Sequence, residues 1–199
     1  MNDYGSDGIY ITPRRVGEDG WELSIKALID NADCSHKARF TLIDADGNEK
    51  ASTIADLRPI ISAKLPVEDP VLWNGRKNPY LYTVRCEIFD STTQEVTDNI
   101  DIRTGLREYH IDSHKGFFLN GEHIKLQGVS RYQDRENMGN AITEKQHAED
   151  IKIILDVGAN SVRLAHYQQN SYFYDLCDES GLLVWAEVPV ISRFSPKRN

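Results

Sequence analysis

The chain has 199 residues, of which 40% are apolar, and it carries a formal net charge of -8 with a pI of about 5.2. This length allows one large domain or two small ones, and the apolar content argues against a disordered chain. The acidic balance and the absence of any long Lys/Arg run exclude nucleic acid as an expected partner.

The cysteines and the apolar segments indicate a compartment. The chain has an odd number of cysteines, which are widely spaced and outside any Cys/His cluster: Cys34, Cys86 and Cys177. We therefore interpret them as reduced, largely buried thiols. Residues 1–8 do not have the pattern of a signal peptide, and the apolar stretch at 182–186 is far too short to span a membrane. We therefore expect a cytoplasmic protein with no membrane partner.

Strand signals dominate residues 1–104. Apolar residues occupy every second position from Trp21 to Ile29 and again from Tyr80 to Ile88, the period of a half-buried strand. Asp46-Gly47 predicts a hairpin turn. Further strands are expected at residues 9–16, 61–65 and 98–104. About seven short strands in about 100 residues predict an all-β immunoglobulin-like sandwich domain.

From residue 105 the pattern alternates between strands and helices. Asn120-Gly121 predicts a hairpin between Phe117–Leu119 and Ile124–Leu126, with the second arm continuing to Val129. Thr143, with Gln146 three residues later, predicts a capping box that opens a helix ending at Gly158.

The next elements complete a βαβ pattern. A strand is expected at Ser161–Ala165, a helix at Ser171–Ser180 closed by Gly181, and a strand buried on both faces at Leu182–Val188. Three parallel strands with connecting helices open either a (β/α)8 barrel or a doubly wound sheet. The pattern leaves both open, although the absence of a G-x-G-x-x-G loop makes a dinucleotide-binding sheet the weaker interpretation.

Polar and aromatic residues gather at the expected C-terminal ends of these strands, where βα units place functional groups. They are Ser130, Arg131, Tyr132, Gln133, Asp134, Arg135, Arg163, His166, Tyr167, Gln168, Gln169, Trp185 and Glu187. Such a set suits a hydroxyl-rich ligand, for example a sugar ring. Purely structural roles are the alternative for some of these residues. Arg163 could pair with Glu187, Tyr132 could serve packing alone, and Asp134 and Arg135 could form a surface ion pair.

Two stretches resemble the catalytic barrel of glycoside hydrolase family 2, the family of β-galactosidases, β-glucuronidases and β-mannosidases. They run from Phe118 to Arg131 and from Asn160 to Glu187, and the spacing matches over about 80 residues. Pro70–Asn74 and Asn78–Tyr82 resemble the immunoglobulin-like domain that precedes this barrel. The form of residues 128–142 is most similar to the β-galactosidase branch.

The resemblance implies a retaining mechanism with two glutamates roughly 5 Å apart. It places both beyond the third barrel strand, so neither is expected within this chain, and Glu187 is interpreted as a structural acid. His166 matches the family's sugar-contacting histidine and Arg163 the arginine that supports the nucleophile. Tyr132 and Gln169 stand where relatives usually carry histidine. No cofactor is expected in this chain, and the resemblance implies magnesium only for a longer parent.

The sequence thus predicts two domains, a sandwich at residues 1–104 and about three βα units of a (β/α)8 barrel at residues 105–199. Tyr132, Arg163 and His166 are the expected substrate-binding residues, and a β-galactoside is the expected sugar. We expect the fragment to be inactive alone and to self-associate through its incomplete barrel. The alternatives are a β-glucuronidase of the same family and a non-catalytic sandwich module that binds carbohydrate or protein.

Overall fold

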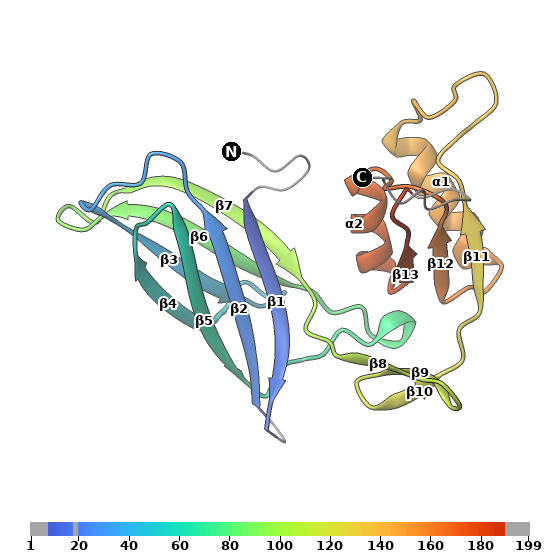
Figure 1. Cartoon of the computed structure of the whole chain (residues 1–199), viewed down its shortest axis with the longest axis horizontal. Helices are drawn as coiled ribbons and strands as arrows, with labels where there is room; N and C mark the ends of the chain where they lie inside the picture. The colour runs from blue at the N-terminus through green and yellow to red at the C-terminus, as the bar shows by residue number, and fades with distance from the viewer. Residues whose placement is uncertain (1–7, 18–19, 190–199) are drawn as a thin grey trace, which may run out of the picture. The chain divides into compact units, whose positions relative to one another are not determined.

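The computed structural model describes residues 8–17 and 20–189, which are mostly β-strand with two α-helices. The chain divides into two compact units (Figure 1). The first, here called the sandwich unit, comprises residues 1–73, 80–110 and 118–122. The second, here called the βα unit, comprises residues 74–79, 111–117 and 123–199.

Seven strands in two antiparallel sheets form the sandwich unit. They are β1 (Ile9–Val16), β2 (Gly20–Leu28), β3 (His36–Ile43), β4 (Glu49–Asp56), β5 (Ile60–Glu68), β6 (Tyr82–Asp90) and β7 (Val96–Thr104). One sheet has the order β1-β2-β5 and the other β4-β3-β6-β7. All pairings within them are antiparallel, as in an immunoglobulin-like sandwich.

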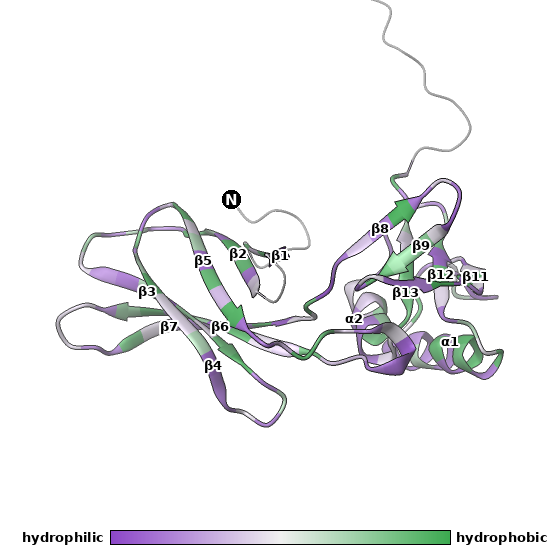
Figure 2. Cartoon of the chain, turned by 90° about the horizontal axis from the view of Figure 1, so that it is seen from below, coloured by the Kyte–Doolittle hydropathy of each residue, from purple (hydrophilic) through white to green (hydrophobic). Residues whose placement is uncertain are grey.

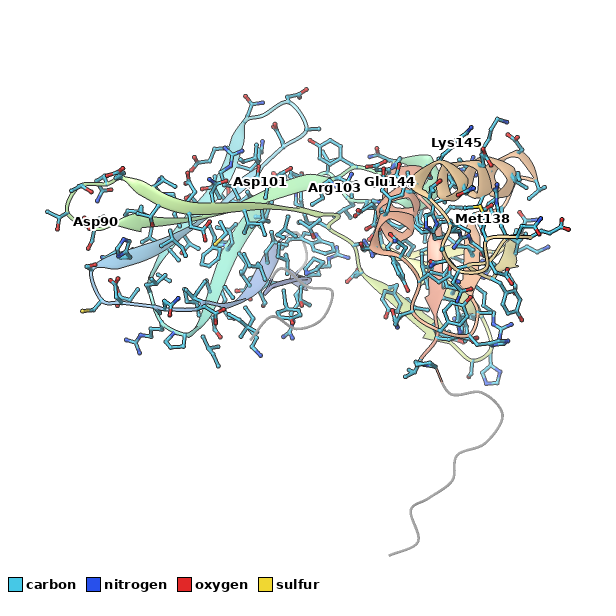
Figure 3. All side chains as sticks on the ribbon, turned by 90° about the horizontal axis from the view of Figure 1, so that it is seen from above. Asp90, Asp101, Arg103, Met138, Glu144 and Lys145 are labelled. Carbon is cyan, nitrogen blue, oxygen red and sulfur yellow. The ribbon has the colours of Figure 1, made fainter. Side chains whose placement is uncertain are left out.

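The core of this unit follows from the period-two pattern of the strands (Figure 2). Trp21, Leu23, Ile25 and Ala27 of β2 are all buried, as are Phe40 and other inward residues of β3 and β6. The edge strand β7 instead carries charged side chains such as Asp101 and Arg103 on its exposed positions (Figure 3). The apolar positions expected from the sequence therefore face the core, and the polar positions between them face solvent.

The regular alternation expected from Tyr80 to Ile88 breaks near its end. Phe89 is 2% exposed, whereas Ile88 is only partly buried. The register between β6 and β7 shifts between Ile88 and Phe89, which marks a β-bulge. The extra residue, Thr97, lies in β7, whereas the register between β3 and β6 continues unbroken through Ile88 and Phe89. Phe89 is therefore buried on the outer face of the sheet, where the guanidinium carbon of Arg39 lies 4.6 Å from its ring centroid.

A small sheet of order β10-β9-β8 follows in the chain, with β8 at Tyr109–Asp112, β9 at Gly116–Leu119 and β10 at Glu122–Ile124. The predicted Asn120-Gly121 turn is present, and both residues have positive φ. The expected continuation of the second arm to Val129 is wrong. The Asn160 side chain accepts from the Gln127 N–H and donates to the Lys125 carbonyl, which directs these backbone groups away from a continued hairpin ladder.

The βα unit is built on three parallel strands in the order β11-β12-β13. These are β11 (Gly128–Arg131), β12 (Ser161–Leu164) and β13 (Leu183–Ala186), joined by α1 (Glu144–Asp156) and α2 (Ser171–Ser180), and the unit also holds the 3-10 turn η1 (Gly75–Lys77). No helix in the described ranges is long and apolar enough to cross a membrane.

Both helices have the ends that the sequence predicts. The Thr143 N–H donates to Gln146 Oε1 at 2.6 Å in a capping box at the start of α1. Gly158 and Gly181 follow the two helices with φ of 80° and 71°. Ile151 and Ile154 of α1 and Phe173 and Cys177 of α2 join Val162, Leu164 and Leu182 in one buried core.

Two burial predictions are wrong. Cys86 and Cys177 are free and buried, but Cys34 is free and exposed because it lies in the turn between β2 and β3. The strand β13 is not buried on both faces, since Trp185 is 63% exposed. Among the described residues β13 pairs only with β12, so its other edge lacks a neighbour.

Candidate functional site

The C-terminal ends of the three parallel strands bring the predicted site residues together. Tyr132 follows β11, His166 lies two residues beyond β12, and Glu187 follows β13. Arg163 lies within β12 and pairs in register with Ser130 and Trp185 of the neighbouring strands. Parallel strands present their C-terminal ends at one edge of the sheet, which explains why residues far apart in sequence meet here.

Tyr132, Arg163, His166 and Glu187 form a continuous set of polar contacts, here called the edge cluster. Arg163 Nε donates to Glu187 Oε1 at 2.6 Å. His166 Nδ1 lies 2.9 Å from Glu187 Oε2 and 3.4 Å from an Arg163 terminal nitrogen, and His166 Nε2 lies 3.0 Å from the Tyr132 hydroxyl. The pairing of Arg163 with Glu187 considered from the sequence is therefore present.

These contacts define a proton arrangement at His166. The short contact to a carboxylate places a hydrogen on Nδ1, and Nε2 lies within hydrogen-bond distance of the Tyr132 hydroxyl. Hydrogen bonds first from Arg163 and then from His166 lower the pKa of Glu187 below its ordinary value, which keeps this carboxyl group ionised. The cluster is open to solvent, since the Arg163 and His166 side chains are 44% and 34% exposed.

A buried polar network, not foreseen from the sequence, lies at the end of β11. The Arg131 side chain is 5% exposed and donates to Asp150 Oδ2 from Nε at 3.0 Å and from a terminal nitrogen at 2.8 Å. It also contacts Gln169 and His147 Nδ1, and its guanidinium carbon lies 3.8 Å from the Phe173 ring centroid. The sequence signal was the placement of His147 and Asp150 on the apolar face of α1.

Other residues named from the sequence have different partners. Arg135 does not pair with Asp134 but with Glu149 at 2.7 Å and Asp150 at 3.0 Å, because α1 presents these carboxylates toward it. Gln169 is 8% exposed and belongs to the Arg131 network.

The edge cluster can donate and accept hydrogen bonds to a hydroxyl-rich ligand. Arg163, His166 and Tyr132 present polar groups at least partly exposed to solvent, and Tyr132 and Trp185 add aromatic surface that is 49% and 63% exposed. No group of three or more His, Cys, Asp or Glu side chains in the described part of the chain could hold a metal ion.

Two family models match the chain. The model described as "Glycosyl hydrolases family 2" matches residues 7–107, and the model described as "Glycosyl hydrolases family 2, TIM barrel domain" matches residues 111–198. The sequential order of β11, β12 and β13 fits the opening of a barrel but does not by itself distinguish it from a doubly wound sheet.

Individual relatives point to the same family. A β-glucuronidase of Bacteroides fragilis is 37% identical over 95% of this chain and 28% of its own length. A β-galactosidase of Thermoanaerobacter pseudethanolicus is 30% identical over 95% of this chain and 26% of its own length. The crystal structure of a Bacteroides uniformis β-glucuronidase superposes with a TM-score of 0.87 at 30% identity, covering 98% of this chain and 24% of that one.

The chain therefore spans less than a third of the length of these relatives. Both halves of its sequence nevertheless match models of one family. The two matches follow one another along the chain in the same order as the seven sandwich strands and the elements of the βα unit. On these grounds the chain belongs to glycosyl hydrolase family 2.

Proposed function

We propose that this chain is the sandwich and opening barrel segment of a retaining β-glycosidase, and that its edge cluster contacts the sugar. The observation that carries the proposal is the fixed imidazole of His166, held at Nδ1 by Glu187 and at Nε2 by Tyr132 at the C-terminal edge of the sheet. A side chain whose orientation is set before binding loses little freedom when a ligand arrives. Residues 1–104 and 105–199 are the proposed domains.

Glu187 serves this site as a positioning group. A glycosidase acid must hold a proton near neutral pH and therefore needs a raised pKa, whereas the contacts of Glu187 lower its pKa. Retaining hydrolysis also needs a second carboxyl group about 5 Å away, and the edge cluster contains one carboxylate. We propose that the 199-residue chain alone does not hydrolyse glycosides and that both catalytic glutamates belong to a longer protein.

A β-glucuronide is the first proposed sugar class. The Bacteroides fragilis β-glucuronidase shares 37% identity over 95% of the chain, against 30% over the same share for the Thermoanaerobacter β-galactosidase. A β-galactoside is the second candidate, favoured by the sequence of residues 128–142.

The test compares hydrolysis of 4-nitrophenyl β-glucuronide and 4-nitrophenyl β-galactoside by a longer family 2 enzyme that carries this chain. We expect His166→Ala to lower kcat/KM by about tenfold or more, the loss of roughly one charge-assisted hydrogen bond. His114→Ala, an exposed histidine outside the cluster, is the matched control. Equal activity of the His166 variant and the control would refute the proposed contact, and turnover by the 199-residue chain that Glu187→Gln abolishes would refute the placement of the catalytic groups.

A further inference from the structure

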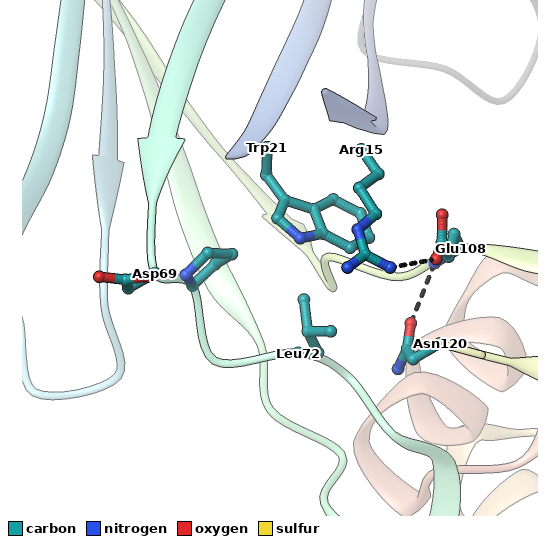
Figure 4. Close-up of a pocket in the computed structure, with 7 residues that line it drawn as sticks. Arg15, Trp21, Asp69, Leu72, Glu108 and Asn120 are labelled. Atoms are coloured by element: carbon teal, nitrogen blue, oxygen red, sulfur yellow. Dashed lines mark hydrogen bonds and ion pairs between the residues drawn. The ribbon is translucent and has the colours of Figure 1, made fainter. Parts of the chain in front are cut away.

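A polar pocket lies wholly within the sandwich unit and shares no residue with the edge cluster (Figure 4). Its volume is about 220 Å³. The side chains that matter for its chemistry come from β1, β2, the segment after β5 and the turns around β8 and β9, and they are Arg15, Trp21, Asp69, Leu72, Glu108 and Asn120.

Trp21 places an unused hydrogen-bond donor in this pocket. The residue is only 6% exposed, yet its indole N–H has no hydrogen-bond partner among the described residues. Figure 4 shows the nitrogen-bearing side of the indole turned toward Leu72, beside the guanidinium of Arg15. This N–H is not among the fully buried side-chain atoms of the described residues that lack a partner, so it is open to the pocket, where an external acceptor can reach it.

The opposite wall is held in place by Asn120. Its side chain accepts from the Glu108 N–H at 3.0 Å and donates to the Trp73 carbonyl at 3.0 Å, while its own N–H donates to the Glu108 carbonyl at 2.9 Å. Arg15 then donates to Glu108 Oε1 at 3.0 Å. The Glu108 carboxylate is therefore oriented at the pocket without any ligand.

We propose that this pocket binds one ring of a neutral, polyhydroxylated ligand, that is, a monosaccharide or a single residue of a glycan. The Trp21 N–H supplies a donor, and the Glu108 carboxylate supplies an acceptor for hydroxyl groups. The ion pair between Arg15 and Glu108 balances the two charges at this wall, which suits a neutral ligand. The volume lies below the roughly 300–1,000 Å³ of drug-sized sites, which fits one sugar ring. This proposal does not rest on the proposed function.

The test is a titration of the 199-residue chain with methyl β-D-glucopyranoside and methyl β-D-galactopyranoside, followed by the indole N–H signals in 1H–15N NMR. The chain has three tryptophans, and Trp21→Phe assigns the relevant signal. We expect the Trp21 signal to shift saturably in the millimolar range. The exposed Trp185 belongs to the βα unit, so a shift of that signal alone would report binding near the edge cluster and overturn the pocket proposal.

Two variants separate ligand contact from folding. Because one hydrogen bond is removed, Trp21→Phe should weaken binding by about twofold to tenfold, as measured by the ligand's own saturation-transfer signal. Glu108→Gln should also weaken binding, because it removes the charge of the acceptor at the pocket wall, whereas Glu49→Gln on the exposed strand β4 should not. An unmoved Trp21 signal at saturating sugar, or unchanged affinity in both pocket variants, would overturn the proposal.

Discussion

Replacing Arg131 by methionine should destabilise the βα unit strongly. Arg131 is almost completely buried and its charge is compensated by Asp150, with Gln169 and His147 as further partners. Removing one partner of a buried ion pair costs about 3–5 kcal/mol, because the other charge remains without compensation. Asp150 is 22% exposed and keeps its contact with Arg135, so we expect the lower end, about 3 kcal/mol.

Amide hydrogen exchange measures this loss separately for the two units. A change of about 3 kcal/mol lowers the protection of the α1, α2 and β11–β13 amides by roughly two orders of magnitude. Protection in the sandwich unit should change much less, since Arg131 makes its contacts within the βα unit.

Arg135→Met is the matched control. This arginine also binds Asp150 but its side chain is 31% exposed, and exposed ion pairs contribute about 0–1 kcal/mol. The reasoning fails if the Arg131 and Arg135 variants lose equal protection, or if the Arg131 variant exchanges like the unmodified chain.

Three further predictions concern pH, thiol reactivity and association. Burial and the charge of Arg131 lower the pKa of His147, so the unfolded state binds a proton more readily than the folded state. The free energy of unfolding should therefore fall as the pH drops below about 6.5. His147→Phe should reduce the difference in this free energy between about pH 7.5 and about pH 5.5, measured by urea unfolding. Burial raises the pKa of Cys86 to about 11 and of Cys177 to about 12, so Cys34 alone should react rapidly with a thiol reagent in the native chain, and three rapid equivalents would contradict this. The edge of β13 that lacks a neighbour among the described residues, together with the exposed Trp185, should make the chain associate. Sedimentation velocity should show association that rises with concentration and that Trp185→Lys reduces. A monomer at every concentration would contradict this prediction.

Local patterns predicted the elements of this chain well because they depend on neighbouring residues. The strand at 9–16, the Asp46-Gly47 hairpin and the helix opened by Thr143 all depend on side-chain period, turn conformation or a cap within a few residues. The gathering of Tyr132, His166 and Glu187 followed from one further rule, that parallel strands end at the same edge.

The errors arose where a distant residue decided the outcome. Phe89 is buried because Arg39 of the neighbouring strand β3 covers its ring, and not because of the period of its own strand. The hairpin arm ended at Ile124 because Asn160, far along the sequence, took the backbone groups that an extended arm would have used. Sequence period carries no information about such partners, and neither does it reveal that Arg131 is buried while Arg163 is exposed.

The buried network and the edge cluster are connected through Gln169. Its amide nitrogen donates to the Arg131 carbonyl at 3.1 Å and lies 3.5 Å from the Ala165 carbonyl, and these residues directly precede Tyr132 and His166. One buried side chain thus ties together the two backbone segments that carry the hydrogen-bonded pair. Because Arg131 in turn holds the Gln169 side chain, the position of His166 depends on an ion pair that it never contacts. This arrangement explains why an exposed cluster can keep a fixed geometry.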